Sequence, residues 1–121
     1  MTPPRTLIAL ALAGLLTLTG CAQDPPVVDG DADAPISIQV RIADGKVSPL
    51  GTSYAAEVGQ SIVLDVTSDT DDELHLHAEP EETFAVTPGT HRFEFAVEVP
   101  GSVSLESHHV GGTIATIDVS P

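Results

Sequence analysis

The sequence predicts an all-β domain, an antiparallel sandwich or barrel, that follows an apolar N-terminal segment. Apolar and polar residues alternate over short stretches from residue 35 onward, and this period of two is typical of half-buried strands. The chain has 10 glycines and 10 prolines, and several of them stand between these stretches, as in turns. No segment after residue 21 has the periodicity of a helix of useful length. Short, regularly spaced strands without helices favour two packed sheets.

Each element follows from its local pattern. Isoleucine and valine alternate with polar residues over 36–42, which predicts the first strand. The pairs Asp44-Gly45, Pro88-Gly89 and Pro100-Gly101 are turn signals. Further strands are expected, in chain order, over residues 46–49 (short), 54–58, 61–67, 73–79, 83–86, 92–98, 103–107 and 113–119.

The N-terminus has the layout of an export signal. Residues 1–6 are short and carry one basic side chain, and the apolar run 7–18 is too short to span a membrane as a helix. The following Leu18-Thr19-Gly20-Cys21 is similar to the lipobox of bacterial lipoproteins. Two alternatives remain: an ordinary secretory signal with a chance cysteine, and a cytosolic protein with an apolar start.

The lipobox resemblance implies that residues 1–20 are cleaved and that Cys21 takes a diacylglyceryl group through a thioether. Two acyl chains anchor a protein stably. We therefore expect an extracytoplasmic protein, lipid-anchored to the outer face of the bacterial cytoplasmic membrane. Residues 21–34 carry the lipidated cysteine and a Pro-, Asp- and Gly-rich stretch that predicts a flexible acidic linker, and residues 35–121 form the domain. Cys21 is the only cysteine, so the mature domain cannot form an internal disulfide.

The charge balance limits the partners. The chain has 18 acidic residues against 4 lysines and arginines, for a formal net charge of −14. Such a surface repels nucleic acid and anionic lipid head groups, so no nucleic-acid partner is expected. The remaining candidates are the membrane, through the lipid on Cys21, and an envelope protein.

The stretch ELHLHA, residues 73–78, carries two of the five histidines. On a strand, His75 and His77 lie on one face, opposite the two leucines. His108 and His109 follow the strand expected over 103–107. If these strands are neighbours, up to four imidazoles converge, and neutral imidazole suits Cu, Zn or Ni.

Acidic residues near this stretch could add an oxygen ligand: Asp71, Asp72 or Glu79. His91 precedes an arginine and is interpreted as a surface or edge residue. The alternative is a solvated strand face whose histidines bind no metal.

From about residue 38 to 119 the chain resembles small cupredoxin-like domains of secreted bacterial lipoproteins. The resemblance implies an antiparallel Greek-key β-sandwich. The stretch LHLHA also resembles the HLHG segment of multicopper oxidases, which implies that His75 and His77 are copper ligands, although Ala78 replaces the usual glycine. His108 matches the family histidine by its spacing from the Pro100-Gly101 turn, with His109 as the substitute. The matching stretches are Ile38-Gln39-Val40, Gly45-Lys46-Val47, Val58-Gly59-Gln60, LDVTSDTDDELHL over 64–76, and Pro100-Gly101 with the strand leading to His108.

Departures from the family pattern exclude blue-copper electron transfer. That site needs a cysteine thiolate, usually with a methionine, but Ser107 stands where the cysteine is expected. Cys21 is committed to lipid, and the only methionine is Met1. The histidines are also too few for a multicopper oxidase or a Cu/Zn superoxide dismutase.

No catalytic constellation is evident, so we expect a binding protein rather than an enzyme. Ser107 and His108 are neighbours on a strand and point to opposite faces. Gly111-Gly112 lacks the lysine and helix of a phosphate loop. The expected function is binding, handling or delivery of a metal ion, copper first and zinc second, through histidines. The alternative is a metal-free interaction or structural module of the same fold, without cofactor.

Overall fold

The computed structural model describes residues 27–29 and 33–121. Within these residues every regular element is a strand, and no helix has the length and apolarity needed to cross a membrane. The predicted signal peptide, the lipobox and Cys21 lie outside the described residues. The strands are β1 (Val27–Asp29), β2 (Ile36–Ala43), β3 (Lys46–Ser48), β4 (Thr52–Glu57), β5 (Ile62–Ser68), β6 (Asp72–Leu76), β7 (Glu82–Val86), β8 (Gly89–Phe95), β9 (Gly101–Ser107) and β10 (Thr113–Ser120).

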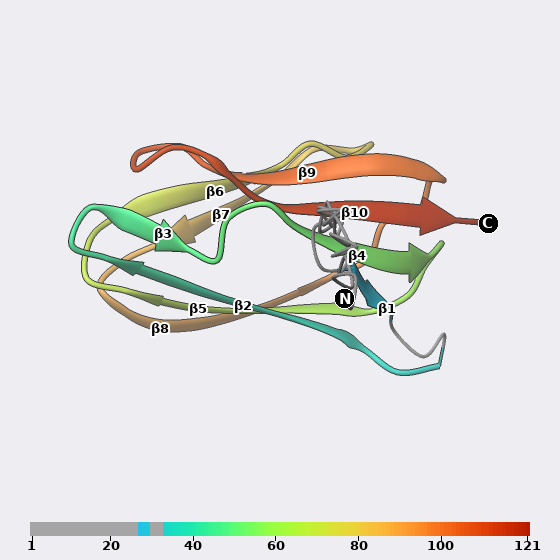
Figure 1. Ribbon diagram of the computed structural model, residues 1–121, viewed down its shortest axis with the longest axis horizontal. Coiled ribbons are helices and arrows are strands. Elements are labelled where there is room, and N and C mark those ends of the chain that lie inside the picture. The colour runs from blue at the N-terminus through green and yellow to red at the C-terminus, as the bar shows by residue number, and fades with distance from the viewer. Residues whose placement is uncertain (1–26, 30–32) are drawn as a thin grey trace, which may run out of the picture.

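Two sheets pack face to face, which confirms the predicted all-β class. The larger sheet has six strands in the order β1-β4-β10-β9-β6-β7, and the smaller has four in the order β3-β2-β5-β8. In Figure 1, β6, β9 and β10 lie in the upper layer, and β2, β5 and β8 lie in the lower one. β6 and β9 are direct neighbours. The strand that carries His75 therefore lies beside the strand that leads to His108.

The expectation of an antiparallel sandwich is wrong in part, because both sheets are mixed. β2 pairs with β5 in parallel, and β4 pairs in parallel with both β1 and β10. The physical reason is the connectivity. Only β2–β3, β6–β7 and β9–β10 are consecutive strands paired in one sheet, whereas the other connections between β3 and β9 cross from one sheet to the other. A strand arriving by such a crossing can run in the same direction as its new neighbour.

Residues 27–29 lie within the stretch 21–34 that the sequence predicts as a linker, but they form β1 in the structure. This short strand pairs with β4 at the edge of the larger sheet. The edge of β4 offers unpaired backbone groups, and the Val-Val pair favours an extended conformation that can satisfy them.

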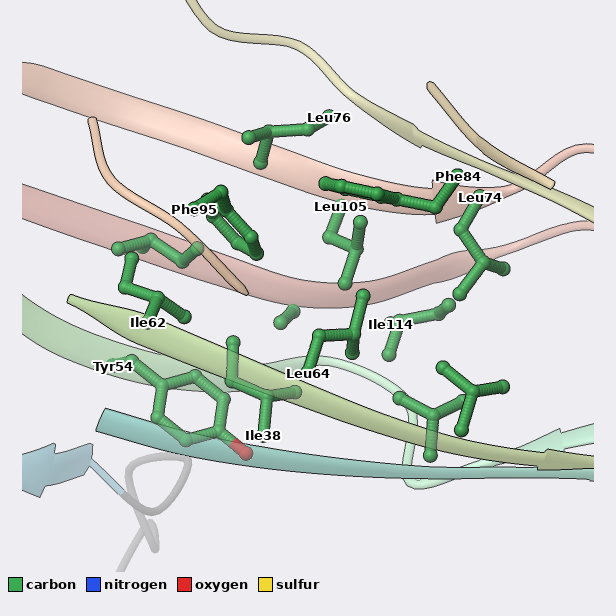
Figure 2. Close-up of a cluster of buried hydrophobic side chains, with 14 of the residues drawn as sticks. Ile38, Tyr54, Ile62, Leu64, Leu74, Leu76, Phe84, Phe95, Leu105 and Ile114 are labelled. Carbon is green, nitrogen blue, oxygen red and sulfur yellow. The ribbon is translucent and has the colours of Figure 1, made fainter. Parts of the chain in front are cut away.

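The core lies between the sheets and follows from the alternation in the sequence. β2 is alternately buried and exposed, with its isoleucines and valine inside. In Figure 2, Leu105 from the larger sheet lies opposite Leu64 from the smaller one. These two side chains and those of Leu74 and Ile38 are fully buried. Since Leu74 faces inward, its neighbours in β6 must face outward. The core therefore fixes which face of the larger sheet carries the candidate site.

Candidate metal centre

β6 presents His75 on the outer face of the larger sheet. Leu74 and Leu76 point into the core and are 0% and 1% exposed, whereas the His75 side chain between them is 22% exposed. The expected strand 73–79 included His77, but β6 ends at Leu76, so His77 lies just past the strand. The backbone N–H of His77 nevertheless donates to the carbonyl oxygen of Ser104 at 2.8 Å, which keeps this residue alongside β9.

The two rings lie together. The ring centroids of His75 and His77 are 4.3 Å apart, with an angle of 42° between the planes. The Glu81 carboxylate lies against both: Oε2 is 3.4 Å from Nε2 of His75, and Oε1 is 3.6 Å from Nδ1 of His77. These three side chains each offer a ligand atom, and the three atoms lie within 4.8 Å of one another. They could therefore hold one metal ion.

Sequence reasoning did not identify Glu81. The β6–β7 hairpin places it there, since Leu76 pairs with Glu82 and the connection between them folds back beside the strand. The recognisable signal was Pro80, a turn residue shortly after the HxH stretch and directly before the glutamate. The oxygen donors expected from the sequence were Asp71, Asp72 and Glu79, and none of these belongs to the three-residue group.

A second carboxylate comes from the neighbouring strand. Glu106 of β9 pairs with His75 in the strand register, and its Oε2 lies 3.3 Å from Nε2 of His77. The other oxygen, Oε1, accepts hydrogen bonds from Ser104 Oγ at 3.2 Å and from Thr113 Oγ1 at 3.5 Å. Glu106 is thus held by hydroxyls of β9 and β10 while it faces the imidazole.

His108 lies beside the cluster formed by His75, His77 and their carboxylates. Its ring meets that of His75 edge-on, at an angle of 75° between the planes and with centroids 6.0 Å apart. Its Nδ1 is 3.6 Å from Oε1 of Glu73, and its backbone N–H donates to the Glu73 carbonyl at 2.9 Å. The side chain is 63% exposed, more than that of His75 or His77. The structure therefore places three of the four predicted histidine ligands near one another, but only His75 and His77 belong to the three-residue group.

His109 is held elsewhere. Its Nδ1 lies 3.4 Å from the carbonyl oxygen of Asp71, and its backbone N–H donates to Asp72 Oδ1 at 3.0 Å. No ring contact among the described residues joins His109 to the cluster, so its ligand role stays a prediction. His91 lies on β8 in the other sheet, stacked on Phe93 at 6.0 Å, in agreement with its interpretation as a surface or edge residue.

Asp72 anchors the loop that carries His108. It is only 4% exposed and accepts hydrogen bonds from the Ser107 hydroxyl and from the backbone N–H groups of His109 and Glu73. Burial by itself raises the pKa of Asp72, but these hydrogen bonds and the charge of His109 outweigh it and hold the pKa below its ordinary value. Ser107 donates to this carboxylate rather than to a histidine, so it is not arranged as an activated nucleophile.

The donor set fits a divalent ion of borderline hardness. Two imidazoles and a carboxylate are nitrogen and oxygen ligands, which suit Cu(II) and Zn(II). The 22% exposure of His75 and 42% exposure of His77 leave the group open to solvent, so an ion can enter and water can complete its coordination.

No family model matches the sequence, and no curated protein matches it either. Solved structures do resemble the fold. The laccase-like multicopper oxidase CueO from Ochrobactrum sp. aligns with a TM-score of 0.52 at 18% identity, over 79% of this chain and 29% of that one. The copper nitrite reductase from Nitrosomonas europaea aligns with 0.54 at 15% identity, over 73% of this chain and 42% of that one.

Auracyanin B, a protein of similar size, aligns with a TM-score of 0.52 at 12% identity, over 76% of this chain and 93% of that one. The chain thus spans less than half the length of the two enzymes and nearly all of the auracyanin. These neighbours are cupredoxin-like domains, so the chain has a cupredoxin-like fold.

Proposed function

We propose that this protein binds a divalent metal ion, copper first and zinc second, as a membrane-anchored module of the bacterial cell envelope. The observation that carries the proposal is the convergence of His75, His77 and Glu81, whose ligand atoms lie within 4.8 Å of one another. Fold similarity to a multicopper oxidase and a copper nitrite reductase supports the choice of copper. So does the affinity order of nitrogen and oxygen sites, in which Cu(II) exceeds Zn(II).

The test is metal-dependent stabilisation. An ion that binds only the folded state raises the melting temperature, so Cu(II) should raise that of the purified protein. The double variant His75→Ala/His77→Ala should lose this shift, and His91→Ala, a histidine on the other sheet, should keep it. A shift that survives in the double variant would exclude this site.

A metal-free interaction module is the second candidate, and one observation favours it. Each clustered imidazole already has a carboxylate within 3.6 Å: Glu81 for His75, Glu106 for His77 and Glu73 for His108. Such a network can be a hydrated polar surface without an ion. It predicts no melting shift with Cu(II) or Zn(II), and a partner recovered by crosslinking on intact cells.

The anchor is tested separately. Lipidation of Cys21 should place the protein in the membrane fraction, and Cys21→Ala should move it to the soluble extracytoplasmic fraction. Release of the wild-type protein without detergent would argue for an ordinary secretory signal. Metal binding and anchoring are independent, so either proposal can fail alone.

A further inference from the structure

From the contacts of Glu106 we infer that this residue positions His77, so that His77 binds the metal through Nδ1 and keeps its proton on Nε2. The inference rests on the proposed metal site and names a residue that sets its geometry. It starts from the two nitrogens of His77, which face different carboxylates.

Nδ1 of His77 points into the three-residue group. It is the nitrogen 3.6 Å from Oε1 of Glu81, whose other oxygen is 3.4 Å from Nε2 of His75. A metal ion shared by these side chains would therefore meet Nδ1 of His77 and Nε2 of His75. Nε2 of His77 faces the opposite way, toward Oε2 of Glu106 at 3.3 Å.

The two carboxylates differ in how firmly they are held. Glu106 is 40% exposed, and Ser104 and Thr113 donate to its Oε1. Glu81 is 63% exposed and lies in the β6–β7 connection, where its two oxygens face the imidazoles of His75 and His77. Glu81 is therefore suited to move onto an ion, and Glu106 is suited to stay as an acceptor for the Nε2 proton.

The physical consequence is a fixed ring orientation. A lone pair on Nε2 would repel the Glu106 carboxylate, whereas an N–H there is attracted by it. A carboxylate that accepts from the second nitrogen of a ligating histidine fixes its tautomer and raises its basicity, and removing it costs about 10–100-fold in metal affinity. Without Glu106 the His77 ring can turn and offer Nε2 instead.

The test uses Zn(II), which is diamagnetic, with the full chain carrying ¹⁵N-labelled histidine. In the wild-type protein the ¹⁵N spectrum should show a metal-bound Nδ1 and a protonated Nε2 for His77. Glu106→Ala should weaken Zn(II) binding about 10–100-fold and change the His77 pattern. Glu106→Gln, which keeps an acceptor oxygen, should retain the pattern and most of the affinity.

Asp118→Ala is the matched control, because it removes an exposed acid from the same sheet and should leave the affinity and the spectrum unchanged. Zn(II) ligation of His77 through Nε2 in the wild-type protein would overturn the inference while leaving the metal site intact. An unchanged Zn(II) affinity in Glu106→Ala would also overturn the inference and leave the metal site intact. A wild-type protein that binds neither Zn(II) nor Cu(II) would overturn the proposed function together with this inference.

Discussion

The Ser107 hydroxyl donates to Oδ2 of Asp72 at 2.7 Å and so ties the end of β9 to the start of β6. Ser107 also accepts from the backbone N–H of Gly111 at 3.1 Å. Its position is the one where the family resemblance leads one to expect a copper-binding cysteine. In this chain it serves a buried hydrogen-bond network that shapes the 107–111 loop, and this places His108 beside the other histidines.

Asp72→Asn is expected to lower the free energy of unfolding by about 1–3 kcal/mol, because a buried charged acceptor of three hydrogen bonds is replaced by a neutral one. Urea unfolding at pH 7 measures the change. Asp71→Asn, an exposed neighbour, should change stability by less than about 0.5 kcal/mol. Equal effects of the two substitutions would show that the Asp72 network does not stabilise the fold.

The same network predicts an acid-dependent loss of stability. The folded pKa of Asp72 lies below its ordinary value, so the ionised carboxylate favours the folded state. This contribution is complete above about pH 5 and is lost as the pH falls through the unfolded pKa of about 3.9 toward the folded one. Unfolding free energies measured between pH 6 and 2 should therefore fall more steeply in the wild type than in Asp72→Asn. If the unfolding free energies of the two proteins fell equally with pH, the acid-dependent loss could not be assigned to Asp72.

Leu105→Ala tests the core beneath the site. Leu105 is fully buried in β9, so truncation should cost about 2–5 kcal/mol through lost burial and a cavity. Val99→Ala is the surface control, since Val99 is 47% exposed, and should cost less than about 0.5 kcal/mol. Denaturant unfolding compares the two, and a small loss for Leu105→Ala would mean that β9 is not packed as described.

The alternation of apolar and polar residues made most of the strands predictable from the sequence. Residues 36–42 and 113–119 were expected as strands and are strands, because one-sided burial imposes a period of two. The parallel pairings were not predictable, because alternation does not show which sheet a strand joins. At the site, His75 and His77 followed from local spacing. Glu81 did not, because it reaches them only through the fold of the β6–β7 connection.

Glu81→Gln tests the residue that the sequence did not reveal. The neutral amide is a poorer metal ligand than a carboxylate, so Cu(II) or Zn(II) affinity should fall at least about tenfold. Isothermal titration measures it. Glu79→Gln changes the charge of the same connection by the same amount and should have little effect. If both variants lose affinity equally, the contribution of Glu81 is general electrostatic attraction rather than ligation.

The last prediction concerns which copper ion is bound. Cu(I) prefers thiolate and thioether ligands, but the chain has one cysteine and one methionine, Cys21 and Met1, and neither lies in the domain. We therefore expect a chromophoric chelator to remove Cu(I) from the protein in a competition assay. Cu(II) should bind, and more tightly than Zn(II), by the affinity order of nitrogen and oxygen sites. Cys21→Ser removes the only cysteine and should leave Cu(II) binding unchanged. Tight retention of Cu(I) by that variant would mean that the copper site is not the group formed by His75, His77 and Glu81.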